Sequence, residues 1–227
     1  LSKKLKEHYK MKLHILSDVH NEFQPYRPPD IDSDIVVLAG DINLGLRGID
    51  WIEKYFSEKP VIYICGNHEY YRHSMPKLTE QLREATAGSH IHFLENNTYE
   101  YEDVVFLGCT LWTDFELFDN HRIAQYEAAK NMNDYRLIRV APKYRKLRPS
   151  DTSILHFQSI QFLKENLEKY SDRKIVVVTH HAPSIKSVPE FFKSDIISAA
   201  YTSNLEDLIR KNNISLWIHG HLHESSD

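Results

Sequence analysis

The sequence predicts an α/β fold in which a mixed sheet system is flanked by helices. Five short apolar runs, each bounded by polar turns, have the Val- and Ile-rich content of strands covered on both faces. Stretches with helical spacing of apolar residues separate these runs. Three closely spaced strand-like runs interrupt the alternation and predict a local antiparallel patch.

The elements are expected in the following order along the chain. The apolar runs are residues 12–17, 35–39, 61–65, 175–179 and 214–218. The runs of the antiparallel patch are residues 90–94, 98–101 and 104–107. Helical spacing is found at residues 49–56, 76–87, 154–167 and 205–209. Ser150 or Asp151 is the expected N-cap of the third helix, and Ser203 or Asn204 that of the fourth.

Composition narrows the class of protein. The chain has 227 residues, which suits one domain with a full core, and its 41% apolar and 26% charged content is that of a soluble globular protein. The net charge of -4 argues against a nucleic acid or an acidic lipid as the partner. No apolar stretch approaches the roughly 20 residues that span a bilayer, and no signal peptide is recognisable.

The cysteines and the chain ends give three further expectations. Cys65 and Cys109 are expected to be buried, reduced thiols, which predicts a cytoplasmic protein. Residues 1–10 are expected to be a loose arm or a cloning remnant, followed by one domain over residues 11–227. Further C-terminal strands are expected after Asp227, because a polar motif lies only four residues before that end.

Polar motifs that contain metal-ligand residue types follow the five apolar runs. They are Asp18-Val19-His20, Gly40-Asp41, Gly66-Asn67-His68-Glu69, His180-His181 and His219-Gly220-His221-Leu222-His223. Each motif alone is a weak or moderate signal. All five at predicted strand ends indicate a hydrolytic site that holds two metal ions.

Oxygen ligands come from the first three motifs. Asp18 and His20 are two residues apart, so in an extended segment both side chains point the same way. Asp41 has two carboxylate oxygens and could bridge two cations. Asn67 offers a neutral amide oxygen that adds no charge.

Besides His20, the imidazole ligands come from the last two motifs. His180, His221 and His223 supply nitrogen, and a mixed nitrogen and oxygen set suits Mn, Zn or Fe better than Ca or Mg alone. Two such ions would clamp a phosphate and lower the pKa of a bridging water to give a hydroxide nucleophile. His68, beside Asn67, is the expected general acid for the leaving oxygen.

Residues 112–150 stand apart because they combine aromatic residues with five arginines: Arg122, Arg136, Arg139, Arg145 and Arg148. Two interpretations remain open. The segment could be a helical excursion with a solvated basic face. It could instead be a lid whose arginines, Arg136 and Arg139 among them, contact an anionic substrate together with Tyr71.

The five motifs together resemble the calcineurin-like metallophosphoesterase superfamily, whose pattern reads D-x-H, GD, GNH[ED], H and GHxH. The resemblance extends over nearly the whole chain from Met11 onward. It implies a four-layer α/β/β/α sandwich of two mixed sheets flanked by helices, with a dinuclear metal centre at the sheet edge. The implied activity is hydrolysis of a phosphomonoester or phosphodiester of a small molecule or nucleotide.

The resemblance also implies a division of the ligands between two metals. The first metal would be held by Asp18, His20, Asp41 and His223. The second would be held by Asp41, Asn67, His180 and His221. His68 and the shared Asp41 would be the catalytic residues.

His181 and His219 are the less favoured members of their motifs, and the sequence leaves an exchange of His180 and His181 open. Glu69 is expected to make a hydrogen bond that supports the ligands rather than to bind metal.

Three alternatives bear on the function. Protein phosphatases of the superfamily carry GDxxDRG, whereas Leu44 occupies the Asp position here, which argues against that activity. A nuclease is disfavoured by the net charge and by the lack of an extended basic stripe. A catalytically silent metal-binding scaffold is disfavoured because every expected ligand and His68 are present. The sequence predicts no oligomeric state.

Overall fold

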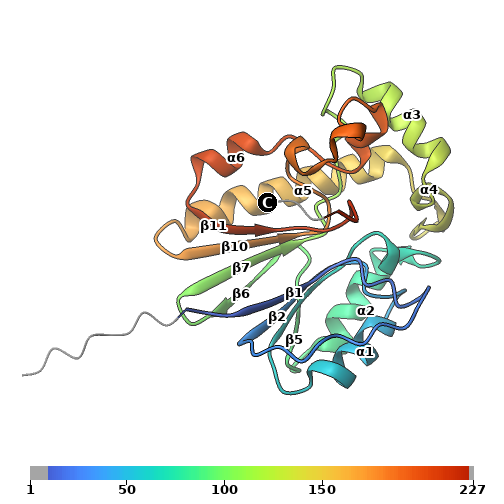
Figure 1. Cartoon of the computed structure of the whole chain (residues 1–227). Coiled ribbons are helices and arrows are strands. Elements are labelled where there is room, and N and C mark those ends of the chain that lie inside the picture. Colours follow the sequence, from blue (N-terminus) through green and yellow to red (C-terminus); the bar gives the residue numbers. More distant parts are fainter. Residues whose placement is uncertain (1–9, 225–227) are drawn as a thin grey trace, which may run out of the picture.

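The computed structural model describes residues 10–224 and confirms an α/β fold with sheets flanked by helices (Figure 1). The expected arm falls almost entirely on residues 1–9, outside the described residues. The first sheet is parallel, with the strand order β1-β2-β3-β5 and the bounds β1 (Leu13–Leu16), β2 (Ile35–Ala39), β3 (Val61–Ile64) and β5 (Ile91–Phe93). The second sheet is mixed, with the order β11-β10-β7-β6 and the bounds β6 (Asn97–Tyr101), β7 (Val104–Cys109), β10 (Lys174–Thr179) and β11 (Ile214–Ile218).

The expected antiparallel patch is divided between these two sheets. Strands β6 and β7 pair antiparallel as predicted, but β5 pairs parallel with β3 in the first sheet. The expectation that both sheets are mixed therefore holds only for the second. Asn96, at a φ of 51°, lies in the turn between β5 and β6, where the chain passes from one sheet to the other.

Each of the four predicted helical stretches corresponds to a helix of the structure, and further helices lie in the segment 112–150. Their bounds are α1 (Arg47–Phe56), α2 (Lys77–Thr86), α3 (His121–Asn131), α4 (Asp134–Leu137), α5 (Pro149–Lys169) and α6 (Glu206–Lys211). The predicted N-caps are wrong. Helix α5 begins one residue after Arg148, and the Asp151 carboxylate instead accepts a hydrogen bond from the Arg148 backbone N–H at 2.9 Å. Helix α6 has Leu205 at its N-cap.

Strand β2 shows how the core is divided. Its alternate residues Ile35, Val37 and Ala39 join a cluster formed with side chains of β3, β7, β10 and β11, which places that cluster between the two sheets. Val36 and Leu38 point to the other face, into a cluster with residues of α1 and α2. A third cluster lies between the second sheet and α5. Figure 1 shows α1 and α2 beside the first sheet and α5 and α6 beside the second. Burial on both faces explains why the strand sequences are almost continuously apolar.

The segment 112–150 is only partly helical. After α3 and α4 it forms a hairpin of β8 (Arg139–Val140) and β9 (Arg145–Lys146), and β8 pairs parallel with β4 (Ser74–Met75). Short 3₁₀ turns are found in the remaining loops, at η1 (His68–Tyr70), η2 (Ile185–Ser187), η3 (Glu190–Phe192) and η4 (Ile196–Ala200). A small third sheet therefore ties the excursion to the loop that follows β3.

Cys65 and Cys109 are buried free thiols, as predicted. Within residues 10–224, none of the helices has both the length and the apolar character that crossing a membrane requires.

Candidate metal centre and active site

Five of the predicted ligand residues adopt the left-handed backbone conformation. Their φ angles lie between 49° and 71°, and the residues are Asp18, His20, Asp41, His221 and His223. The expected extended segment at Asp18 and His20 is therefore wrong, because both residues have a positive φ in the loop after β1 ends. Left-handed non-glycine residues cost about 1–3 kcal/mol each and persist where the surrounding structure fixes them.

Two glycines make room for this packing. A Cβ on Gly40, whose φ is +87°, would lie 2.5 Å from the backbone nitrogen of Gly66. A Cβ on Gly66 would lie 2.1 Å from Asp41 Oδ1 and 2.7 Å from His180 Cε1. The loops after β2 and β3 can approach each other only because both positions lack a side chain.

Glu69 joins the same two loops. Its buried carboxylate accepts hydrogen bonds from the backbone N–H groups of Asp41, Ile42 and Gly66, at 3.0, 2.8 and 2.7 Å. It also accepts one from the Tyr63 hydroxyl at 3.1 Å. The prediction that Glu69 supports the ligands through hydrogen bonds is confirmed.

The first ligand cluster contains Asp18, His20, Asp41 and His223, and one ligand atom from each residue lies within 4.8 Å of the others. His223 Nε2 is 3.5 Å from Asp18 Oδ1, and His20 Nε2 is 3.7 Å from Asp41 Oδ2. The two Nε2 atoms of His20 and His223 are 3.1 Å apart. These atoms converge on one point from three different loops.

The second cluster contains Asp41, His180 and His221, all buried. His180 Nε2 lies 3.3 Å from Asp41 Oδ2 and 3.1 Å from Asn67 Oδ1, so the Asn67 amide oxygen faces the same space. Among the described residues, Asp41 Oδ2 and His221 Nε2 are buried without a hydrogen-bond partner. Buried polar atoms are normally paired, so two unpaired ligand atoms at one place fit a cation site.

The two buried histidines of the second cluster differ in protonation, and a metal ion would have to displace a proton from His180 but not from His221. His180 Nδ1 donates to the Ala39 carbonyl at 2.9 Å, which leaves Nε2 directed at Asp41. Burial opposes the charge of His180, but the Asp41 carboxylate outweighs it and raises the pKa of His180 to about 10. Burial and the neighbouring histidines lower the pKa of His221 well below its ordinary value, so this imidazole keeps a free lone pair.

A third cluster, which the sequence did not predict, joins Glu22 to His20 and His68. Glu22 Oε1 accepts from His68 Nδ1 at 2.7 Å and from His20 Nδ1 at 3.1 Å. Burial alone would raise the pKa of Glu22, but the two histidine contacts dominate and lower it to about 2. Because both Nδ1 atoms are bound to Glu22, both Nε2 atoms face the clusters. In the sequence, the one feature that points to Glu22 is its position two residues after His20.

Asp134 is the second residue that the sequence did not identify. It lies on α4, is 1% exposed, and accepts hydrogen bonds from Asn67 Nδ2 at 2.9 Å and from the Tyr71 hydroxyl at 2.7 Å. The amide nitrogen of Asn67 is thereby turned toward α4 and its oxygen toward His180. No local pattern could have revealed this contact, because Asp134 lies 67 residues beyond Asn67.

We expect Asp134→Ala to weaken metal binding at the second cluster by roughly 10–100-fold, because the Asn67 amide loses the group that orients it. Asp134→Asn should weaken it less, since its amide oxygen can still accept both hydrogen bonds. Calorimetric titration of metal-free protein with Mn²⁺ measures the effect. Equal affinities in Asp134→Ala and the unchanged protein would contradict this role.

The two disfavoured histidines lie outside the clusters. His181 Nδ1 lies 3.2 Å from the Thr110 carbonyl, and His219 Nε2 lies 2.9 Å from the Ser187 hydroxyl. Of the adjacent pair, it is therefore His180 whose Nε2 lies near Asp41. His181 nevertheless affects the stability of the fold, because it is an ionisable side chain that is only 1% exposed.

Burial, followed by the nearby charge of His180, lowers the pKa of His181 to about 3 from an ordinary value of 6.5. Between these two values the unfolded state binds one more proton than the folded state at this residue. Its contribution to the free energy of unfolding is thus complete above pH 6.5 and falls by about 1.4 kcal/mol per pH unit as the pH decreases.

We therefore expect the stability difference between the unchanged protein and His181→Gln to shrink steadily from about pH 7 to about pH 5. Urea titrations at several pH values measure it, with the exposed His121→Gln as the control. A difference that does not vary with pH would contradict the expectation.

A pocket of about 390 Å³, called the main pocket below, opens over the clusters. Its lining includes Asp41, His68, Tyr71, His221 and His223. Tyr71 lines this pocket, and its ring lies over that of His68 with 4.2 Å between centroids; its contact with a substrate stays a prediction.

Arg136 and Arg139 do not line the main pocket. The guanidinium group of Arg136 donates to the Lys130 carbonyl, and that of Arg139 donates to the carbonyls of Arg136 and Ile138 at 2.8 and 3.2 Å. Both arginines therefore bind main-chain oxygens of their own segment. Arg145 likewise pairs with the Asp151 carboxylate at 2.6 Å.

Residues 11–225 match the family model of the calcineurin-like phosphoesterases, and the chain belongs to that family. With the ligand clusters, this membership identifies a metallophosphoesterase, a hydrolase with metal-binding residues. An uncharacterized protein of Acanthamoeba polyphaga mimivirus is similar, with 27% identity over 226 residues that cover 91% of this chain and 78% of the relative.

Proposed function

We propose that this protein is a dinuclear metal-dependent phosphoesterase that hydrolyses a phosphomonoester or phosphodiester of a small molecule or nucleotide. The observation that carries the proposal is the position of Asp41. This carboxylate belongs to both ligand clusters, and its buried Oδ2 has no hydrogen-bond partner among the described residues. A carboxylate between two sets of imidazole and oxygen donors is suited to bridging two cations.

The donor atoms fit two ions. Asp18, His20, Asp41 and His223 would hold the first, and Asp41, Asn67, His180 and His221 the second. The mixed nitrogen and oxygen set favours Mn, Zn or Fe. When bound, two such ions lower the pKa of a water for attack on phosphorus and offset the charge of the phosphate.

His68 would complete the reaction as the general acid. Attack forms one bond from oxygen to phosphorus and breaks the bond to the departing alcohol, whose oxygen needs a proton. The Glu22 carboxylate accepts from His68 Nδ1, which leaves Nε2 to carry that proton, 4.0 Å from Asp41 Oδ2. Glu22 would also stabilise the positive charge of His68 before the proton is transferred.

The proposal is tested by turnover of a panel of phosphoesters, with Mn, Zn, Fe and Mg added separately to metal-free protein. We expect hydrolysis that depends on the added metal and is strongest with Mn, Zn or Fe. Comparison of monoesters with diesters defines the preference. Full metal occupancy without hydrolysis of any phosphoester would contradict the proposal and favour a silent scaffold.

A nuclease would share the same metal chemistry, so the panel includes an oligonucleotide beside a nitrophenyl phosphodiester. We expect the small diester to be cleaved in preference to the oligonucleotide. The net charge of -4 supports this expectation, because it does not attract a polyanion. Faster cleavage of the oligonucleotide would assign a nuclease instead.

A further inference from the structure

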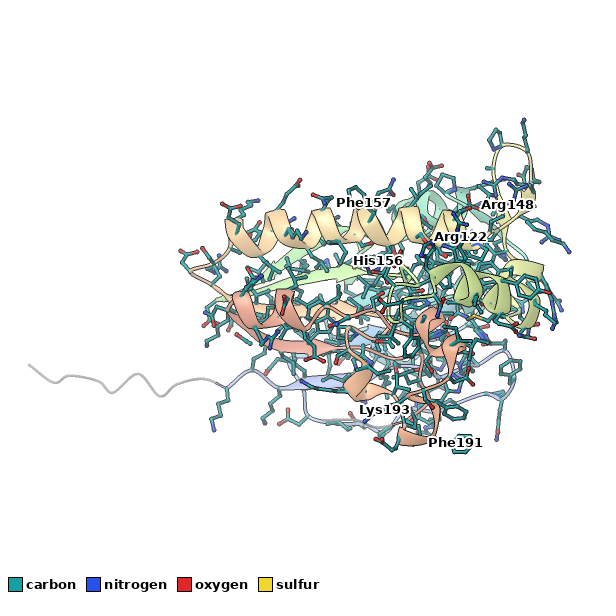
Figure 2. The ribbon with its side chains drawn as sticks, turned by 90° about the horizontal axis from the view of Figure 1, so that it is seen from above. Arg122, Arg148, His156, Phe157, Phe191 and Lys193 are labelled. Atoms are coloured by element: carbon teal, nitrogen blue, oxygen red, sulfur yellow. The ribbon has the colours of Figure 1, made fainter. Side chains whose placement is uncertain are left out.

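A second cavity, called the side pocket below, lies next to the main pocket and has a volume of about 280 Å³. Its apolar wall comes from the two residues before η3, from η3 and η4 themselves, and from the last motif, and consists of Val188, Pro189, Phe192, Ile197 and Leu222. Phe192 is 48% exposed and its neighbour Phe191 86%. Figure 2 shows Phe191 pointing outward at the edge of the molecule. None of these apolar side chains belongs to the ligand clusters.

The side pocket and the main pocket share part of their walls. Ile197, Tyr201, Leu222 and His223 line both. The Tyr201 ring stacks on that of His221, with 4.7 Å between centroids and an angle of 27°. The side pocket therefore borders the main pocket along these residues and is the neighbouring space for a group attached to a phosphate at the clusters.

The size and charge of the side pocket limit what it can hold. An apolar cavity of about 150 Å³ is enough for benzene, so about 280 Å³ admits one or two fused rings. Asp195 and Glu224 are the carboxylates in its lining. Their charge disfavours an anionic group, whereas Phe192 and Tyr201 offer ring surfaces for stacking.

We propose that the side pocket binds an uncharged aromatic or heteroaromatic ring of the substrate, such as a phenyl group or a nucleobase. This inference rests on the proposed function, because the phosphate of the same molecule would lie at the clusters. It narrows the substrate class to phosphoesters that carry such a ring within reach of the phosphorus. Phosphoesters of small alkyl alcohols would bind without using the side pocket.

Binding of phosphonates that cannot be hydrolysed tests the inference apart from turnover. Calorimetry on the Mn²⁺-loaded protein compares 2-phenylethylphosphonate with propylphosphonate. Burial of the ring should make the first bind about 10–100-fold more tightly. A nucleoside phosphonate in the same series tells a nucleobase from a simple phenyl group as the preferred ring.

Phe192→Ala should reduce the preference for the ring compound about three- to tenfold and leave propylphosphonate unaffected. Phe192→Leu, which keeps an apolar side chain, should give an intermediate result. Phe157→Ala is the matched control, because Phe157 is 62% exposed on α5, away from η3 (Figure 2).

Equal affinity of the unchanged protein for the two phosphonates would overturn the inference, as would equal weakening of both by Phe192→Ala. If phosphoesters are hydrolysed in either case, the proposed function stands and only the role of the side pocket fails. If neither phosphonate binds and no ester is hydrolysed, the proposed function fails and this inference fails with it.

Discussion

Asp41→Asn is expected to lower phosphoester hydrolysis on the order of 10³-fold or more, because the charge stabilisation from a metal site is worth several kcal/mol and each 1.4 kcal/mol is about tenfold. Asp41 belongs to both ligand clusters, so one substitution weakens both sites. Asn keeps an oxygen that can accept the hydrogen bond from the His68 backbone N–H, which is 2.8 Å from Asp41 Oδ1. The loop should therefore keep its shape while the bridging charge is lost.

Metal content and activity are to be measured on the same preparations. We expect Asp41→Asn to retain less than one ion per chain, and Asn67→Ala or His221→Ala to lose the second ion only. Glu165→Gln removes a negative charge from an exposed position of α5 and serves as the control for net charge. If Asp41→Asn retains two ions and full activity, Asp41 does not bridge the metals.

His68→Ala is expected to keep both ions and to lose roughly 10²–10⁴-fold in rate on alkyl phosphates, which is the usual contribution of a general acid. Nitrophenyl esters should be affected much less, because nitrophenolate leaves without needing a proton. His68 is not one of the expected ligands, so metal analysis should show no change. The measurement is the rate of hydrolysis across a series of leaving groups of increasing pKa.

Glu22→Gln should show the same dependence on leaving group in weaker form. The amide cannot stabilise the His68 cation as a carboxylate does, although it can still accept a hydrogen bond from Nδ1. Glu22 also contacts His20 Nδ1 at 3.1 Å, so metal content is measured beside the rate. Alkyl phosphate hydrolysis that stays intact in His68→Ala would show that the acid has been assigned wrongly.

The sequence located the strands and the side chains that converge in the clusters for a specific physical reason. Parallel strands buried on both faces read as continuous apolar runs, and their carboxyl ends meet at one edge, so motifs such as Gly40-Asp41 can be located from the chain alone. The left-handed backbone at Asp18 and His20 was not predicted, because only the packing of neighbouring loops imposes it.

The contacts that the sequence did not reveal join segments distant along the chain. Glu22 approaches His68 across 46 residues, and Asp134 approaches Asn67 across 67. The N-cap prediction for α5 failed for a local reason. Asp151 lies three residues after the actual N-cap, Arg148, and its carboxylate accepts from the Arg148 backbone N–H and from the Arg145 guanidinium. Strand β5 was placed wrongly because length and composition do not say which sheet a short strand joins.

The pairing of β4 with β8 affects how a substrate enters the site and how products leave it. The excursion over residues 112–150 is fastened at β8 by main-chain pairing and at α4 by the buried Asp134 carboxylate. Swinging it outward would break both attachments, including the hydrogen bonds that Asp134 accepts from Asn67 and Tyr71. We therefore expect the excursion to stay fixed during turnover, so that the alcohol and the phosphate leave the site along η3 and η4 without any segment opening.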